Sequence, residues 1–458
     1  MPSPSIDHIQ GLIETSRIHT VRVAWIDLHG QIRSKSMPAG LIHQDMSIGM
    51  VGTLMLKDTS DRTAFKVFDA EHFTQFKGSE RFAGGSNLIL KPQVDSDNTR
   101  FHPLPWSPHS AWLLTAPFFA DGQPVELDAR WQLKKALAKL ESLGYKMRCG
   151  LEIEFHIYKI ETEAEAQDPA AATWPGMPPR VSLLHPGYQL LSDSYTDRCH
   201  VAMEIVRETA LGLGLPLTSL EIEFGPSQFE AVFDVQDALT SADSMTLFTN
   251  GVRQALRRAG YHATFMCRPP FANIMSSGWH LHQSLIDSTT GETVLPSSDI
   301  GQNYLAGLIQ HGRAMAAFAA PSVTSYARYQ PNALAPQTVS WGMDSRAAML
   351  RVLPNRIENR VGEPMANPYL YLASQIYAGL DGLQAKLAVP CENDPAAKPL
   401  PVSLGEALDE LQASDVYSAG FGKDFIAYYD HIKRFELARY EATDDKLAWV
   451  KSEYFNRF

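Results

Sequence analysis

Carboxylate and imidazole side chains alternate with apolar residues in the segment GLEIEFHIY. Glu152, Glu154 and His156 alternate with apolar residues, so a β-strand here would bury one face and present two carboxylates on the other. Two glutamates side by side on a strand repel each other unless a cation lies between them. Taken alone, the motif is more often a solvated strand face, because glutamate is usually exposed.

A second segment, SLEIEFGPSQFEAVF, repeats the pattern. Glu221 and Glu223 share a strand face, GPSQ predicts a turn, and Glu230 returns on the following strand. Two antiparallel strands would bring Glu223 and Glu230 close enough to bind one cation. This repetition favours a metal site over two unrelated exposed faces.

Two more segments add potential ligands. SSGWHLHQSL places His280 and His282 on one face of a predicted strand. RIENRVGEP places Arg356, Glu358 and Arg360 on one face of another. Each segment alone is explained by surface charge or a hydrogen-bonded core histidine. Mostly carboxylate ligands with one imidazole suit Mg²⁺ or Mn²⁺ better than Zn²⁺, and several carboxylates are what two adjacent ions need.

The elements around these segments follow from turn and cap signals. TVRVAWIDLHGQIRSKSMP predicts a hairpin that turns at His-Gly, and the three prolines of FHPLPWSPHS predict a domain boundary. ELDARWQLKKALAKLESLGY predicts a helix with Asp128 as N-cap and Gly144 as its stop. The polar stretch ETEAEAQDPAAATWPGMPPR predicts an exposed excursion.

Composition excludes several classes of protein. The chain has 458 residues, 45% hydrophobic and 20% charged, which is typical of a globular protein of two or three domains. A net charge of −11 argues against a nucleic-acid or anionic-membrane partner. The sequence contains no apolar run long enough to span a bilayer and no signal-peptide pattern, so we expect a cytoplasmic protein. Four dispersed cysteines predict neither a disulfide scaffold nor a thiolate zinc site.

Together, the motifs resemble the glutamine synthetase family. The matching stretches are LEIEF, EFGPSQFE, SGWHLH, SYARYQPN, DSRAAMLRV and RIENRVGEPMANPYL, in the family's order over nearly the whole chain. The resemblance implies an α+β fold, with an N-terminal β-grasp domain at residues 1–105 and a catalytic domain with a curved antiparallel sheet at 106–458. It also implies homo-oligomeric stacked rings, with a dodecamer expected, in which a neighbour's N-terminal domain completes each active site.

The resemblance assigns roles residue by residue. The first metal would be held by Glu154, Glu223 and Glu230, and the second by Glu152, His280 and Glu358. Arg346 and Arg351 match the family's arginines that bind the ATP phosphates and the transferred phosphoryl group. Arg328 and Arg360 match the arginines that bind glutamate. The positions of His282, Ser284 and Arg356 match residues that contact the nucleotide. The sequence contains no Walker-type phosphate loop, which fits a family that holds ATP with metals and arginines.

The implied reaction is ATP-dependent amide synthesis. Glutamate's γ-carboxylate is a poor electrophile, so it first accepts the terminal phosphoryl group of ATP to give γ-glutamyl phosphate. An amine then attacks this acyl phosphate, and phosphate leaves.

The sequence departs from true glutamine synthetases around the amine. Six residues after Arg328, in SYARYQPNALAPQ, Leu334 stands where those enzymes carry a glutamate that closes the site over ammonium, and Met275 with Ser276 replaces their Asn-Gly. We interpret this segment as a lid with an apolar tip, and we expect the acceptor pocket to include Leu334, Tyr188, Met275 and Trp279. The neighbour-subunit aspartate that completes the site matches Asp58 weakly, with Asp61 as the alternative.

Loss of that carboxylate favours an organic amine with a hydrophobic body. Desolvated ammonium needs several acceptors, and alkylamines or polyamines, with a pKa of roughly 10, must lose a proton before they attack. An aromatic amine such as aniline is already neutral at cytoplasmic pH. We therefore expect a γ-glutamyl-amine ligase that uses an aromatic amine. The alternatives are a γ-glutamylpolyamine or alkylamine synthetase, an ordinary glutamine synthetase and a catalytically silent ring scaffold.

Overall fold

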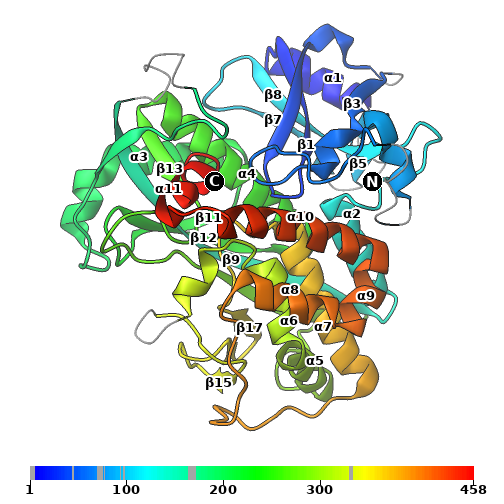
Figure 1. The fold of residues 1–458 in the computed structure, drawn as a ribbon, viewed down its shortest axis with the longest axis vertical. Helices are drawn as coiled ribbons and strands as arrows, with labels where there is room; N and C mark the ends of the chain where they lie inside the picture. The colour runs from blue at the N-terminus through cyan, green and yellow to red at the C-terminus, as the bar shows by residue number, and fades with distance from the viewer. Residues whose placement is uncertain are drawn as a thin grey trace.

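The computed structural model describes residues 6–43, 46–69, 76, 78–92, 94–95, 98–162, 172–329 and 334–458. Two β-sheets organise the chain, a smaller one in the N-terminal part and a larger one in the remainder (Figure 1). Helices pack around the larger sheet. The fold is α+β, as the sequence predicts.

The N-terminal sheet has the strand order β2-β1-β8-β4-β3, with β7 paired to β8. Its strands in the described residues are β1 (Thr20–Ile26), β2 (Ile32–Pro38), β3 (Ile48–Val51), β4 (Asn87–Pro92), β7 (Phe101–Pro103) and β8 (Ser110–Phe118). The predicted hairpin is β1-β2, and Asp27 closes its turn by accepting hydrogen bonds from the N–H groups of His29 and Gln31 at 2.9 and 3.0 Å. Helix α1 (Ile6–Thr15) precedes the sheet, and a small ladder joins β5 (Val94–Asp95) to β6 (Asn98–Thr99).

The predicted boundary at residue 105 falls between two strands of one sheet. β8 pairs with β1, β7 and β4, so the N-terminal sheet continues to Phe118. The prolines that suggested a linker instead form a turn, in which the N–H of Leu104 donates to the carbonyl of Ser110 at 2.9 Å. We propose that the boundary lies at residues 119–128, before the first helix of the larger part.

The larger sheet carries the motifs. Its order is β11-β12-β9-β14-β17-β16-β15, with β10 and β13 also paired to β9, and every pairing except β15-β16 is antiparallel. In the described residues its strands are β9 (Tyr145–Thr162), β10 (Arg180–Leu183), β11 (Leu217–Ile222), β12 (Gln228–Asp237), β13 (Tyr261–Thr264), β14 (Trp279–Asp287), β15 (Trp341–Met343), β16 (Leu350–Leu353) and β17 (Arg356–Asn359). The four motif segments therefore meet on neighbouring strands.

The helices of this part, within the described residues, are α2 (Ala129–Glu141), α3 (Asp193–Gly212), α4 (Ala238–Arg258), α5 (Asp299–Gln310), α6 (Gly312–Ala319), α7 (Pro368–Ala385), α8 (Leu404–Gln412), α9 (Asp415–Phe421), α10 (Lys423–Glu441) and α11 (Lys446–Val450). Asp128 caps α2 as predicted, accepting a hydrogen bond from the N–H of Trp131 at 2.9 Å. Helix α7 is buried on nearly all sides, as a central core helix must be.

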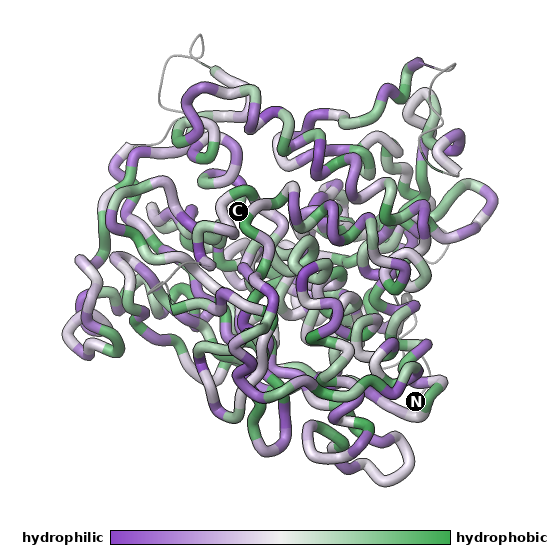
Figure 2. The backbone as a smooth tube through the Cα atoms, turned by 60° about the horizontal axis from the view of Figure 1, so that its bottom comes forward, coloured by the Kyte–Doolittle hydropathy of each residue, from purple (hydrophilic) through white to green (hydrophobic). Residues whose placement is uncertain are grey.

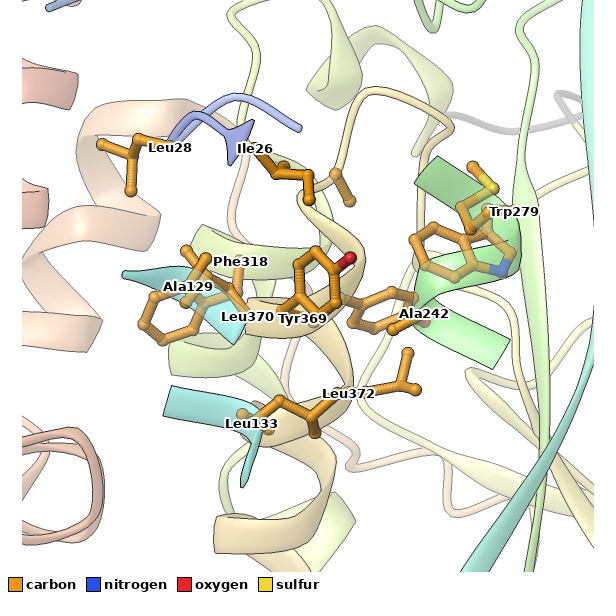
Figure 3. Close-up of a cluster of buried hydrophobic side chains, with 14 of the residues drawn as sticks. Ile26, Leu28, Ala129, Leu133, Ala242, Trp279, Phe318, Tyr369, Leu370 and Leu372 are labelled. Atoms are coloured by element: carbon orange, nitrogen blue, oxygen red, sulfur yellow. The ribbon is translucent and has the colours of Figure 1, made fainter. Parts of the chain in front are cut away.

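The hydrophobic core lies around α7. Figure 3 shows side chains of α7 beside residues of α2, α4, α6 and β14, and Figure 2 shows hydrophilic and hydrophobic residues interleaved along the chain. Among the described residues, no helix combines the length and apolar character that crossing a membrane requires.

Candidate active site

The register of the large sheet places the carboxylates in cross-strand rows. Glu154 of β9 is paired with Glu230 of β12, which in turn is paired with Glu221 of β11. On the other side of β9, Glu152 is paired with His280 of β14. Because alternate residues of a strand share a face, these side chains point to the same side of the sheet.

The first cluster consists of Glu154, Glu223 and Glu230, with one oxygen of each within 4.8 Å of the others. Burial and then the charges of Glu154 and Glu152 raise the pKa of Glu230 to about 9. Burial and then the charge of Glu223 raise the pKa of Glu154 to about 7. Three carboxylates that repel one another at this distance fit a divalent cation, whose charge would offset theirs.

The second cluster adjoins the first. His280 Nδ1 lies 3.1 Å from Glu152 Oε2, 3.8 Å from Glu358 Oε1 and 3.9 Å from Glu230 Oε1. Burial lowers the pKa of His280 to about 4, so its imidazole is neutral at pH 7 and retains a lone pair for a metal. The residues predicted for the second metal are thus brought together, and Glu152 and Glu230 lie between both clusters.

Two arginines hold the buried carboxylate of Glu358. Arg360 Nη1 donates to Oε1, and Arg351 Nη1 donates to Oε2 at 3.0 Å. Burial alone would raise the pKa of Glu358, but His280 and Arg360 lower it. Arg351 of β16 also reaches Asp344, with Nε 2.8 Å from Oδ1, and Arg346, two residues after Asp344, is exposed.

A cavity of about 460 Å³ opens beside the second cluster. It is lined by Glu152, His282, Ser284 and Arg356, which include three residues predicted to contact the nucleotide. Arg356 Nε donates to His282 Nδ1 at 3.1 Å, so this nitrogen is the acceptor and Nε2 donates to Glu152 Oε1 at 2.9 Å. The chain therefore fixes the tautomer of His282 at the cavity wall.

Arg328 is held by backbone carbonyls. It is 3% exposed, and its Nη1 donates to the carbonyl oxygens of Arg360, Val361 and Gly362 at 2.9, 3.3 and 3.2 Å. Arg328 belongs to the predicted lid segment 325–337, of which residues 330–333 lie outside the described residues. Leu334, at the predicted apolar tip, is 67% exposed with a left-handed backbone angle φ of +56°.

An apolar shelf lies beside Glu223 and consists of Tyr188, Phe224 and Met275. The rings of Tyr188 and Phe224 meet edge to face at 5.5 Å, and the Tyr188 hydroxyl donates to the carbonyl of Asn273 at 2.5 Å. Met275 packs closely on Gly225, because a Cβ atom added to Gly225 would lie 2.7 Å from the Cβ of Met275. Tyr188 is 47% exposed, whereas Phe224 and Met275 are half-buried, so the shelf is open mainly at Tyr188.

Trp279 does not belong to the acceptor pocket, contrary to the prediction. It is fully buried, alternates with His280 on β14 and therefore points to the opposite side of the sheet. Its ring meets that of Tyr371 edge to face at 5.0 Å, in the core shown in Figure 3.

Asp58 is also placed differently from the prediction. It is fully buried, and its Oδ2 lies 2.8 Å from Arg439 Nη2 of α10, so its carboxylate lies inside the chain and not at its surface. Asp61 is partly exposed and pairs with Arg33 at 2.7 Å. Of the two aspartates, Asp61 is the one at the surface.

Sequence reasoning missed two residues of the site. Gln228 is buried and donates to Glu154 Oε2 at 3.2 Å, while its Oε1 accepts a hydrogen bond from the N–H of Gly225 at 2.9 Å. Arg148 lines the nucleotide-side cavity. The same alternation that identified Glu152 and Glu154 extends back along β9 to Arg148, so the signal was present in the sequence.

Comparison with known proteins agrees with this geometry. The family model for the glutamine synthetase catalytic domain matches residues 126–451. A γ-glutamylanilide synthase of Acinetobacter sp is 35% identical, covering 98% of this chain and 95% of the relative. A glutamate–isopropylamine ligase of Pseudomonas sp is 28% identical, covering 94% of each chain. A solved structure of GmaS without ligand superposes with a TM-score of 0.76 at 27% identity, covering 96% of this chain and 98% of that one.

The sheet, the paired carboxylate clusters and the arginines define an ATP-dependent ligase that joins glutamate to an amine. The chain belongs to the glutamine synthetase family. Members of this family use ATP and a divalent metal ion, and the two acidic clusters have the donor set for such ions.

Proposed function

We propose that the amine acceptor is organic and hydrophobic, with an aromatic amine such as aniline as the preferred class. The observation that carries this proposal is the open apolar shelf of Tyr188, Phe224 and Met275 beside Glu223. A flat aromatic amine gains contact area on such a surface, whereas ammonium gains none. The similarity to a γ-glutamylanilide synthase supports the same choice.

The chemistry of the amine agrees with the residues around it. Leucine, rather than a carboxylate, stands at position 334, so the lid segment offers no counter-charge to a cation there. An aniline is neutral at pH 7 and attacks without first losing a proton, whereas an alkylamine with a pKa of roughly 10 is protonated and needs a base.

The chain's own residues would divide the work of the first step. Arg351, already fixed by Asp344 and Glu358, and the exposed Arg346 would bind the phosphates of ATP from one side. Arg360 and Arg328, both buried, would bind and orient the glutamate whose γ-carboxylate is phosphorylated. Metal ions held by the two clusters, Mg²⁺ or Mn²⁺, would supply charge stabilisation for this phosphoryl transfer.

The second step takes place at the shelf. The amine would lie on Tyr188 and Phe224 with its nitrogen towards the acyl phosphate. Its lone pair would form the new C–N bond as the C–O bond to phosphate breaks, and the leaving phosphate would take the proton that the nitrogen loses. The bound amine would also exclude water, which otherwise hydrolyses the acyl phosphate.

The experiment that tests this proposal measures glutamate-dependent phosphate release from ATP with ammonium, ethylamine, ethanolamine, putrescine and aniline in turn. We expect the highest kcat/KM with aniline. A second arm uses Tyr188→Ala, which should raise the KM for aniline several-fold and leave the KM for ethylamine unchanged, because only the aromatic amine uses the ring. A higher kcat/KM with ammonium than with any organic amine refutes the proposal, and a higher value with putrescine or ethylamine favours the polyamine or alkylamine alternative.

We further propose that the chain assembles into homo-oligomeric rings, with a dodecamer as the expected size. The family resemblance and the partly exposed Asp61 support this. Light scattering of the purified protein should give a mass near twelve times that of one chain. A monomer with full activity would contradict the proposal that a neighbour completes the site.

A further inference from the structure

A second large cavity, of about 510 Å³, lies between the N-terminal sheet and the catalytic part. Its walls come from β1, α4, β13 and the residues near Asn456, and none of its lining residues belongs to the metal clusters or to the nucleotide-side cavity. It is lined by four arginines: Arg22, Arg253, Arg257 and Arg258.

This concentration of positive charge is unusual in a chain with a net charge of −11. Among the described residues, no aspartate or glutamate lines the cavity. Arg22 donates to Gln254 Oε1 at 3.0 Å and to Ser107 Oγ at 3.2 Å, both of which are neutral acceptors. Arg253 likewise donates to Gln31 Oε1 at 2.6 Å and to the carbonyl of Asn456 at 3.1 Å. These hydrogen bonds orient the guanidinium groups of Arg22 and Arg253, and none of the four acceptors carries a negative charge.

The arginines also repel one another. Burial and then the charge of Arg258 lower the pKa of Arg22, although the two residues come from different parts of the chain. Burial and then the charges of Arg457 and Arg257 lower the pKa of Arg253 to about 10. The fold thus holds several like charges together across one cavity, which costs free energy unless an anion joins them.

We propose that this cavity is a binding site for a small multivalent oxyanion, either a phosphate-bearing or a polycarboxylate metabolite. Guanidinium groups bind both chemistries through paired N–H donors. Arg22 lies on β1 and Arg258 is the last residue of α4, so the two guanidinium groups belong to different walls of the cavity. A ligand that contacts both walls needs more than one anionic group, so we expect it to be multivalent. By bridging β1 and α4 it would join the N-terminal sheet to the catalytic part. This inference does not depend on which amine the enzyme accepts.

The test measures binding by isothermal titration calorimetry without divalent metal, with pyrophosphate and with citrate as the two probes. The double variant Arg22→Met/Arg258→Met removes one charge from each wall and leaves the hydrogen-bonded Arg253 in place. We expect at least about tenfold weaker binding, as the loss of charge-assisted hydrogen bonds implies. The matched control Arg207→Met removes an exposed arginine of α3, outside both cavities, and should change Kd less than about twofold.

Two measurements separate this site from the active site and from misfolding. The double variant should keep the circular dichroism spectrum and the glutamate-dependent ATP turnover of the parent, and Arg22→Lys/Arg258→Lys should recover most of the binding. Binding of pyrophosphate alone would identify a phosphate ligand, and binding of citrate alone a polycarboxylate. The proposal is overturned if neither probe binds at millimolar concentration, or if the methionine variant binds them as tightly as the parent does.

Discussion

The metal-free carboxylate cluster should couple metal binding to proton release. The pKa of Glu230 is raised to about 9 and that of Glu154 to about 7, first by burial and then by neighbouring carboxylates. At pH 7 the metal-free protein therefore holds about one proton on Glu230 and about half a proton on Glu154. Binding of a divalent ion needs all three carboxylates of the cluster ionised, and burial raises the pKa of Glu223 as well, so binding should release at least about 1.5 protons at pH 7 and at least about one at pH 8.

The same shifts predict how the affinity and the stability change with pH. Log K for Mg²⁺ should rise by about 1.5 per pH unit near pH 7 and level off above about pH 9. Both carboxyl groups have a higher pKa in the folded protein than in the unfolded chain. They therefore stabilise the metal-free fold fully at a pH below their unfolded pKa, and this stabilisation is lost as the pH rises through about 7 to about 9. Added metal should therefore raise the unfolding temperature more at pH 8.5 than at pH 6.

Calorimetry in two buffers of different ionisation enthalpy counts the released protons directly. Glu230→Gln should reduce the release at pH 7 by about one proton and weaken Mg²⁺ binding, yet leave the metal-free unfolding temperature nearly unchanged, because that carboxyl group is already protonated. Glu221→Gln is the matched control: it pairs with Glu230 in register but lies outside the metal clusters, so proton release should persist. A metal affinity that does not change between pH 6 and pH 9 would refute the reasoning.

Three further predictions concern single residues. Leu334→Glu should raise kcat/KM for ethylamine relative to aniline, because it returns a counter-charge to the lid; an unchanged ratio would show that residue 334 does not face the amine. Arg148→Met should raise the KM for ATP several-fold and leave the KM for glutamate unchanged, since it lines the nucleotide-side cavity; equal effects on both substrates would contradict this. Trp279→Phe should lower the free energy of unfolding by about 1–3 kcal/mol without changing the preference among amines, because the ring is buried in the core. A changed preference would show that Trp279 does contribute to the acceptor pocket.

The alternation of the motif strands was enough to predict much of the site. It placed Glu152 and Glu154 on one face of β9, and the antiparallel turn at GPSQ returned Glu230 to the side of Glu223. Two histidines separated by one residue had to share a face of β14, and the register places them next to β9. These features depend only on the period of a strand and on pairing between neighbouring segments.

Features that depend on distant contacts were not predictable in this way. The burial of Asp58 follows from its ion pair with Arg439, which comes from a helix near the other end of the chain. The continuation of the N-terminal sheet past residue 105 was not predicted, because the prolines form a turn between two paired strands. Trp279 is different: the alternation that placed His280 in the site already implied that its neighbour points into the core.

The central claim is that this ligase joins glutamate to a hydrophobic organic amine in preference to ammonium. A competition assay tests it most directly: the enzyme, ATP, glutamate and Mg²⁺ are supplied with equal concentrations of aniline and ammonium, and the products are quantified by mass spectrometry. The apolar shelf of Tyr188, Phe224 and Met275 predicts that γ-glutamylanilide exceeds glutamine by at least about tenfold, which corresponds to roughly 1.4 kcal/mol of preferential contact. Glutamine as the major product would contradict the claim.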